Sequence, residues 1–519
     1  MKILLAGPGT GKTTKVKTII NSDFKDSSVQ VISFTNATID DLTDSFKDFE
    51  NVNCATLHSY ALRLNHLEKV QILNDDEIDI IEKLSSKTKI DFSTLCSLLN
   101  CITFDEMIKS CNTFIQNNPV YAEEMIGKLD LLIVDEFQDF NPNEQNLIHI
   151  ISQYANETII LGDDDQSIYS FKDADPEGII NLYNNDKIEK IPHENICYRC
   201  PDTIVDACMK LIANNKNRVK KIWGKSNKKG ELKIIQTTNQ QQTNDTVLKI
   251  IKEIREFDNE GSILILSPVG FASKPLIPML IENGFEPNDC WNKKLDVEDL
   301  KLIWLLRSVF SDNPILNLIL YSYSLKLFSR PKFIAELIGH LKKNARSNDF
   351  KQYLIENLNL DEKFINYFQE TPELELIKEE FKEFSKIAEL INPNFIQSSL
   401  DNIFQLLNPK IDFKKGKVNL MSIHKSKGLQ AEYVFLVGLV SGILPNENYG
   451  LDTIEAQRRL LYVGMSRALK ELFIISNIYW KAEYIHKVDK NQFKYAHWIK
   501  GPIKKYVGKM SAFIEEINK

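Results

Sequence analysis

A glycine-rich loop at residues 6–14, directly after a short apolar run, constrains the fold more than any other stretch. Ile3 to Leu5 predict a buried strand, and Lys12 opens an amphipathic helix. The segment fits the phosphate-loop pattern G-x-x-x-x-G-K-[ST], with Ala6 in place of the first glycine. A strand, a phosphate loop and a helix in this order predict an α/β fold that binds a nucleotide.

Each residue type in this loop has a chemical reason. The glycines let the backbone curl, so that several N–H groups point at one anion at a helix N-terminus. Lys12 supplies a charge to the outer phosphates, and the Thr13 hydroxyl is suited to a magnesium ion. A glycine turn before an ordinary helix is the alternative, which the lysine and threonine in register after a strand disfavour. The expected phosphate-binding residues are Gly7, Gly9, Thr10, Gly11, Lys12, Thr13 and Thr14.

Composition narrows the class of protein. A chain of 519 residues, 43% hydrophobic and 26% charged, is ordinary for a globular protein and long enough for several domains. The net charge of −7 is unlike that of a protein that only coats nucleic acid, although a locally basic channel stays compatible with it. No run of 18 apolar residues predicts a membrane helix, and no signal peptide precedes the loop, so we expect a cytoplasmic protein without a membrane partner.

The eight cysteines are scattered, which predicts reduced thiols. Cys197 and Cys200 have metal-ligand spacing, and His193 and Cys208 lie nearby in the sequence. No second cysteine pair follows at the spacing of a zinc ribbon, so a metal site is the weaker interpretation of this cluster.

Strands alternate with helices along the chain, and polar residues gather where strands end. This pattern predicts open parallel sheets with a site at the carboxyl edge. The stretches 60–128 and 309–409 show mainly helical periods, so a helical insertion interrupts each α/β part. The tail after Trp480 is interpreted as a docked amphipathic helix rather than a nucleic-acid contact. The expected strands are 3–5, 29–36, 131–136, 158–162, 231–236, 262–266, 418–422, 433–438 and 472–476, with a further strand end at 54–59.

A pair of carboxylates, Asp135 and Glu136, ends an apolar strand. One carboxylate can bind magnesium and the other can orient or deprotonate a water molecule. Two solvated turn carboxylates are the alternative, but four apolar residues run straight into this pair. Gln166 follows three aspartates at the end of the next strand, where it could sense a terminal phosphate.

Eight motifs in this order resemble those of superfamily 1 helicases of the UvrD/Rep/PcrA type, over residues 3 to about 476. The resemblance implies two RecA-like parallel-sheet domains, each with a mostly helical insertion. The motifs are AGPGTGKT (6–13), SFTN (33–36), ATLHS (55–59), VDEFQD (134–139), GDDDQSIY (162–169), YR (198–199), IHKSKGL (423–429) and RRLLYVGMSRA (458–468).

The resemblance also implies domain boundaries. The first RecA-like domain covers 1–61 and 129–190, with a reduced insertion at 62–128. The second covers 191–308 and 410–490, with a reduced insertion at 309–409, and 491–519 form a C-terminal tail.

The resemblance assigns roles in ATP hydrolysis. Glu136 is the catalytic base and Asp135 assists Mg²⁺ together with Thr13. Gln166 couples the state of the γ-phosphate to DNA. In the second domain, Tyr198 stacks on adenine, Arg199 reaches the γ-phosphate, Arg467 is the arginine finger and Gln430 contacts the ribose.

A single-strand DNA path follows by the same resemblance, and its aromatic rings would stack on bases without reading sequence. Packing in a hydrophobic core is the alternative for any one of these rings. The implied DNA-binding residues are Phe34, Thr35, Asn36, Thr56, His58, Tyr169, Phe171 and His424.

The implied function is an ATP-dependent 3′→5′ helicase or translocase that acts as a monomer on single-stranded DNA or on single-strand/duplex junctions. The chain departs from the family pattern at Gln430, where glutamate is usual, at Phe171, where tryptophan is common, and at Ser466, where threonine is usual. We also expect the adenine-reading segment that precedes the loop in the family to be missing. The short insertions and the missing segment motivate an alternative, a DNA-stimulated ATPase subunit that gates a protein partner, for example in phage defence or repair, without unwinding by itself.

Overall fold

The computed structural model describes residues 1–65, 70–291, 297–368, 413–447, 451–485, 488–495 and 505–518, and the single positions 373, 376, 391, 396 and 399. The chain divides into two compact units. Unit 1 comprises Met1–Leu57, Asn118–Trp291 and Ile411–Lys519, and unit 2 comprises His58–Asn117 and Asn292–Lys410. Both large sheets belong to unit 1, so the phosphate loop and the late motifs share one compact body.

The first sheet of unit 1 has six strands in the order β3-β2-β6-β7-β1-β8, and every pair of neighbours is parallel. This confirms the predicted α/β class, and the predicted strands differ from the observed ones only at their ends. Because the strands are parallel, the loops after β1, β6 and β7 meet at one edge. The strands are β1 (Lys2–Leu5), β2 (Val29–Ser33), β3 (Val52–Thr56), β6 (Leu129–Val134), β7 (Ala155–Gly162) and β8 (Glu189–Lys190).

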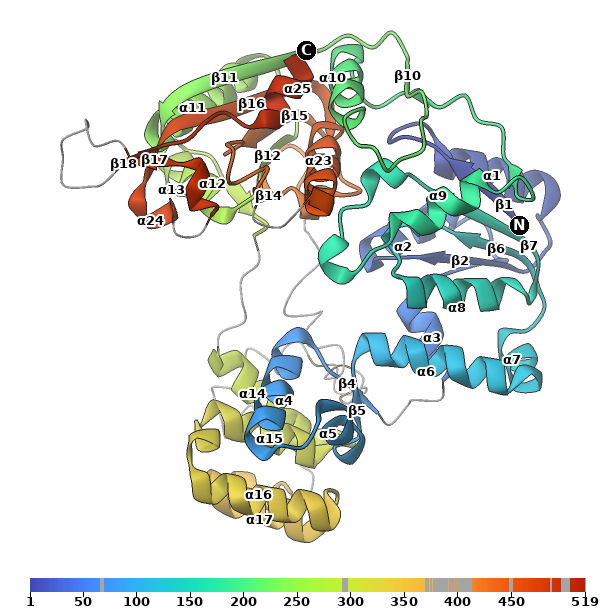
Figure 1. Ribbon diagram of the computed structural model, residues 1–519, viewed down its shortest axis with the longest axis vertical. Coiled ribbons are helices and arrows are strands. Elements are labelled where there is room, and N and C mark those ends of the chain that lie inside the picture. The colour runs from blue at the N-terminus through green and yellow to red at the C-terminus, as the bar shows by residue number, and fades with distance from the viewer. Residues whose placement is uncertain are drawn as a thin grey trace. The chain divides into compact units, whose positions relative to one another are not determined.

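Helices cover this sheet. Apolar residues of α1 and α2, such as Val16, Ile20 and Leu42, pack on strand residues Leu4 and Leu131 to form one buried cluster. Figure 1 shows α8 running alongside the strands of this sheet. The helices are α1 (Lys12–Asp23), α2 (Asn36–Phe46), α7 (Pro119–Ile126), α8 (Pro142–Ser152) and α9 (Pro176–Asn184).

The second sheet has the order β13-β14-β12-β15-β16-β18-β17, with β11 also paired to β16. Its pairs are parallel except those that β18 makes with β16 and β17. A separate parallel pair joins β9 (Ile196–Cys197) to β10 (Gly224–Lys225). The strands of the second sheet are β11 (Glu231–Asn239), β12 (Ile263–Ser267), β13 (Pro287–Asp289), β14 (Val418–Ser422), β15 (Ala431–Val437), β16 (Ala468–Lys481), β17 (Lys494–Tyr495) and β18 (Lys505–Val507).

Alternate residues of this sheet enter two different cores. Leu264 and Leu436 face a cluster that contains α10, α23 and α25, whereas Ile265 and Phe435 face a cluster that contains α11 and α13. Both faces are therefore buried, as parallel sheets require. The helices are α10 (Asp202–Ile212), α11 (Gln240–Phe257), α12 (Gly270–Ser273), α13 (Leu276–Glu282), α23 (Leu451–Met465), α24 (Ala482–Ile485) and α25 (Ala512–Asn518).

We call the first part of unit 1 the part that carries the first sheet, and the second part the part that carries the second sheet and the β9–β10 pair. The C-terminal tail packs on the second part. Phe513, Ile514 and Ile517 of α25 are buried in the core, so a docked helix forms as predicted at the end of the tail, whereas Lys494–Tyr495 and Lys505–Val507 of the same tail are strands. Strands β17 and β18 were not predicted, because elements of two or three residues carry no measurable alternation.

Unit 2 is mainly helical, as predicted for its described residues. Helices α4 and α5 share one core with α15, α16 and α17, so segments from both predicted insertions pack together. The predicted domain boundaries themselves remain a prediction. The short pair β4 (Gln71–Ile72) and β5 (Cys101–Ile102) was missed. The helices are α3 (Leu57–Leu64), α4 (Asp75–Thr88), α5 (Phe92–Leu98), α6 (Phe104–Asn117), α14 (Val297–Phe310), α15 (Pro314–Ser324), α16 (Pro331–Asn344), α17 (Asn348–Leu358) and α18 (Glu362–Asn366).

Within the described parts of the chain, every helix lacks the length or the apolar character needed to cross a membrane.

Candidate active site

The phosphate loop joins β1 to α1 at the carboxyl edge of the first sheet. Gly9 and Gly11 have φ values of 69° and 86°, a left-handed conformation that favours glycine. The Thr10 hydroxyl donates to the carbonyl of Gly7 at 2.8 Å, and Lys12 Nζ donates to the carbonyl of Ala6 at 2.9 Å. The side chains of Thr10 and Lys12 therefore hydrogen-bond to carbonyl groups of the loop itself.

Residues of the second part of unit 1 contact this loop. The Tyr198 N–H donates to the carbonyl of Gly9 at 2.9 Å. A Cβ atom on Gly9 would lie 2.4 Å from Cβ of Arg199, so the close approach requires glycine here. Tyr198 and Arg199, which were predicted to face the nucleotide, thus lie against the phosphate loop.

Two further residues hold the loop from the same side. Asn195 Oδ1 accepts from the Gly7 N–H at 2.8 Å, and Trp223 Nε1–H donates to the carbonyl of Pro8 at 3.0 Å. Sequence reasoning missed both, because they lie outside the recognised motifs.

A pocket of about 230 Å³ opens beside the loop. Its lining includes Thr10 and Lys15 from the first part and His193, Asn195 and Tyr198 from the second. The Tyr198 side chain is 62% exposed, so its ring is available to a flat ligand.

The two carboxylates Asp135 and Glu136 follow β6 directly. Asp135 Oδ1 accepts from the Glu136 N–H at 2.9 Å, and Glu136 itself has φ 54°, a left-handed conformation. Burial and the Glu136 charge raise the pKa of Asp135. Burial opposes ionisation of Glu136 too, but the charges of Lys427 and Lys12 outweigh it and lower the pKa of Glu136. Glu136 is therefore an anion at neutral pH.

Lys427 directly follows η7 (His424–Ser426) of the second part and reaches these carboxylates. Its Nζ bonds Asp139, lies 3.5 Å from Glu136 Oε2 and donates to the carbonyl of Gln166 at 2.9 Å. Burial alone would lower the pKa of Lys427, but the two carboxylates raise it above its ordinary value. The same ammonium lies 5.5 Å from the centre of the Tyr169 ring.

Gln166 and Arg467 meet in this region. Gln166 lies in η2 (Asp164–Gln166) after β7, and its Oε1 accepts from Arg467 Nη2 at 3.3 Å. Arg467 is 1% exposed and also donates to the carbonyl of Val463 at 2.8 Å. Burial and the charge of Arg199 lower the pKa of Arg467 to about 9, so its guanidinium stays charged at neutral pH.

The Arg199 side chain leaves one donor unpaired within the described part of the chain. Its Nε is buried and has no hydrogen-bond partner among the described residues. An unpaired buried donor is costly, which fits a site whose missing partner is a ligand anion.

Aromatic side chains form a continuous row at the carboxyl edge of the first sheet. The ring centres of Phe34 and Tyr169 are 5.2 Å apart, and those of Tyr169 and Phe171 are 5.9 Å apart. Phe171, in η3 (Ser170–Lys172), lies 5.5 Å from His424 of the second part. The structure therefore brings four of the predicted DNA-binding residues into one row.

The comparisons with known proteins agree with this geometry. The family model described as "UvrD/REP helicase N-terminal domain" matches residues 86–187, and the one described as "UvrD-like helicase C-terminal domain" matches residues 318–479. The chain belongs to the UvrD/Rep/PcrA family of superfamily 1 helicases.

Individual relatives of this UvrD-type chain are moderately similar. It is 28% identical over 442 residues to "ATP-dependent DNA helicase Rep" of Buchnera aphidicola subsp. Schizaphis graminum, covering 72% of this chain and 66% of that protein. It is 23% identical to the Rep protein of Buchnera aphidicola subsp. Baizongia pistaciae, covering 91% and 88%. It is 24% identical to "ATP-dependent DNA helicase PcrA" of Bacillus subtilis, covering 78% and 61%. The chain thus spans about two thirds of the length of several relatives.

The other predicted site residues of this UvrD-type protein are placed as follows. Thr35 caps α2, with Oγ1 accepting from the Thr38 N–H at 3.2 Å, and Thr56 is buried at the end of β3. His58 lies in unit 2, with its ring 5.0 Å from Phe104. Gln430 is exposed directly before β15, and Thr13 and Thr14 lie in the first turn of α1. The side chain of Asn36 lies outside the described part.

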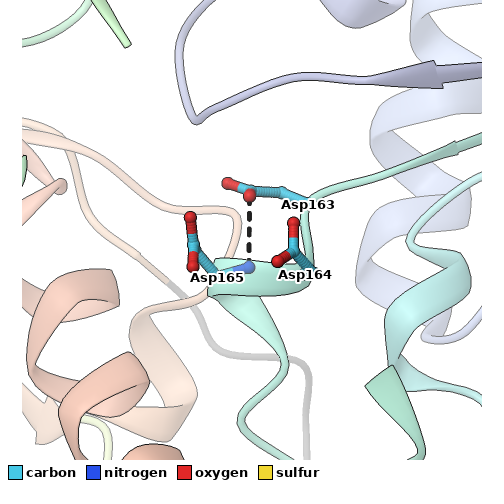
Figure 2. A group of neighbouring side chains, drawn as sticks. All are labelled: Asp163, Asp164 and Asp165. Atoms are coloured by element: carbon cyan, nitrogen blue, oxygen red, sulfur yellow. Dashed lines mark hydrogen bonds between the residues drawn. The ribbon is translucent and has the colours of Figure 1, made fainter. Parts of the chain in front are cut away.

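Three aspartates precede Gln166, and Figure 2 shows them grouped in one turn. Among the described residues, only Asp163, Asp164 and Asp165 bring three potential metal ligands close together. Lys221 Nζ lies 2.8, 2.5 and 2.8 Å from oxygens of these three carboxylates in that order, and Arg218 bonds both oxygens of Asp165. Lys221 and Arg218 therefore already balance the negative charge of these three carboxylates, which need no metal ion for that purpose.

The cysteine cluster carries no metal site within the described residues. Cys197, Cys200 and Cys208 are buried thiols in the core of the second part, and His193 lines the pocket instead.

Proposed function

We propose that this chain is an ATP-dependent motor that moves 3′→5′ on single-stranded DNA and unwinds duplexes, as the resemblance of its motifs implies. The observation that carries the proposal is the meeting of Lys12, Glu136 and Gln166 from the first sheet with Lys427 and Arg467 from the second. A site built from two lobes responds to its ligand by opening and closing, and this response is what a motor needs.

The donor set fits Mg-ATP. Thr13 offers a hydroxyl and Asp135 a buried carboxylate, and oxygen ligands of this kind suit Mg²⁺. Burial and the charge of Glu136 raise the pKa of Asp135, so a cation bound beside Asp135 would favour the ionised form of its carboxylate. When bound, Mg²⁺ offsets the negative charge of the phosphates.

The chain's own groups would perform the hydrolysis. Glu136, ionised at neutral pH, accepts the proton of the attacking water. Arg467 and Arg199, whose Nε lacks a partner among the described residues, would place positive charge where the γ-phosphate develops negative charge. Tyr198, at the rim of the 230 Å³ pocket, would stack on the base of the nucleotide.

Lys427 would couple hydrolysis to DNA. Its ammonium lies against Glu136 on one side and against the ring of Tyr169 on the other. Any movement of the aromatic row on binding a strand would therefore change the surroundings of the catalytic base.

An ATPase assay with and without single-stranded DNA tests the nucleotide site. Lys12→Ala is expected to lower the DNA-stimulated rate by about 10²–10³-fold, because the outer phosphates lose their fixed charge. The matched control is Lys17→Ala on the same helix, whose ammonium lies 6.0 Å from the Phe46 ring and should leave the rate unchanged. A Lys12→Ala protein as fast as the parent would refute the assigned site.

Phe171→Ala tests the DNA path. Loss of one stacking platform is expected to weaken binding of a single-stranded oligonucleotide by about 1–3 kcal/mol, measured by fluorescence anisotropy. The ring is 65% exposed, so folding should be unaffected. Phe257→Ala, a ring 67% exposed on α11, is the matched control, and equal losses in both variants would count against the path.

Strand displacement separates the motor from the alternative. Unwinding of duplexes with 3′ but not 5′ single-stranded tails supports the proposed polarity. DNA-stimulated hydrolysis without unwinding or translocation would instead favour an ATPase subunit that acts through a protein partner, and parallel RNA substrates test the preference for DNA.

A further inference from the structure

The turn after β6 contains a fully buried glutamine that the proposed reaction does not yet use. Gln138 lies in η1 (Phe137–Asp139) and is 0% exposed. Its Nε2 donates to Glu136 Oε2 at 2.5 Å. Its Oε1 accepts from the backbone N–H of Asp163 at 2.9 Å. Both ends of the amide are therefore satisfied, one by the proposed base and one by the loop after the next strand.

We propose that Gln138 is a positioning residue, which fixes the carboxylate of Glu136 and connects it to the loop that carries Gln166. This inference rests on the proposed ATP hydrolysis and goes beyond it by assigning a residue that acts through the base. Gln138 does not itself touch the reacting atoms.

The choice of oxygen supports this role. Gln138 and Lys427 both approach Oε2 of Glu136, at 2.5 and 3.5 Å. Neither contact blocks Oε1, which stays available as the acceptor for a proton from water. When hydrogen bonds fix one oxygen of a carboxylate, the orientation of the other oxygen is fixed as well.

The connection continues beyond Asp163. The side chain of Asp163 accepts from Gln166 Nε2 at 2.8 Å, and Gln166 in turn accepts from Arg467 at 3.3 Å. A continuous series of polar contacts therefore joins the base on the first sheet to the arginine on the second. A displacement of Glu136 or of Arg467 would therefore change the hydrogen bonds of the residues between them.

The chain around Gly162 and Ser167 packs closely against Gln138. A Cβ atom on Gly162, the last residue of β7, would lie 2.4 Å from Gln138 Oε1. The hydroxyl of Ser167 also donates to the carbonyl of Gln138 at 3.0 Å. The position is thus held from the side chain and from the main chain.

Gln138→Met tests the inference, because methionine keeps the length of the side chain and removes both hydrogen-bonding ends. We expect kcat for DNA-stimulated ATP hydrolysis to fall about 10–100-fold, with KM for ATP within about threefold of the parent value. Single-turnover hydrolysis of prebound ATP should show the same loss, which places the effect on the chemical step.

Gln138→Glu is the second variant and keeps the shape of the side chain and the acceptor for Asp163. It replaces the donor to Glu136 with a carboxylate oxygen, so kcat should fall at least as far as in Gln138→Met. The matched control is Gln30→Met, since Gln30 is 3% exposed on β2 of the same sheet and donates only to the carbonyls of Val31 and Asn53. It should lower the melting temperature without changing kcat.

The outcomes are separable. A parent protein that hydrolyses ATP, with folded Gln138→Met or Gln138→Glu at the parent kcat, would overturn this inference alone. A raised KM with unchanged kcat would also overturn it, because the residue would then serve binding. A parent protein without ATP hydrolysis would remove the proposed function and this inference with it.

Discussion

Arg467→Ala is expected to lower kcat for DNA-stimulated ATP hydrolysis by about 10³-fold or more, the largest effect on rate of any single substitution considered for this chain. The guanidinium is buried beside Gln166 and carries its charge from the second sheet to a site on the first. Its contribution appears mainly when the γ-phosphate develops charge, so the affinity for ATP should change much less than kcat. Steady-state kinetics and binding of a non-hydrolysable nucleotide measure the two quantities.

Two further variants make this result specific. Arg467→Lys keeps the charge but loses the planar fork, and should recover only a small part of the rate. Arg255→Ala removes an arginine that donates to the carbonyls of Asp258, Gly261 and Gly416, away from the nucleotide, and should leave kcat unchanged. An Arg467→Ala protein that retains the parent kcat would rule out the arginine-finger role.

Lys221→Met is expected to have the largest effect on stability, about 3–5 kcal/mol in the free energy of unfolding. Its ammonium is the shared partner of Asp163, Asp164 and Asp165, which are all fully buried. Figure 2 shows these three aspartates in one turn. Removing the ammonium leaves like charges facing each other in a site that water does not reach. Urea unfolding, followed by circular dichroism, measures the change.

A double variant and a control test the electrostatic cause. Asp164→Asn in the Lys221→Met background removes one uncompensated charge, and should restore part of the lost stability. Lys225→Met breaks an ion pair with Asp206 in which both side chains are about half exposed, and should cost no more than about 1 kcal/mol. Equal losses of unfolding free energy in Lys221→Met and Lys225→Met would show that the buried cluster contributes no more to stability than an exposed ion pair.

The alternation of apolar strands and helical periods was enough to predict two parallel sheets. Because central strands such as β2, β6 and β12 are buried on both faces, their apolar runs are visible without any knowledge of their neighbours. Short elements such as β17 show no comparable apolar run in the sequence. The same holds for the packing of the two helical segments of unit 2 into one core.

The sequence alone was enough to predict a phosphate loop and the sheet edge that carries it, because the glycines, Lys12 and the pair Asp135–Glu136 are local patterns. Only the tertiary structure decided how these groups are held and charged. Lys427 binds Asp139 across 288 positions of the chain, and Asn195 holds the Gly7 amide across 188. Contacts at such separations depend on how two sheets pack, and no periodicity or spacing within a segment encodes them.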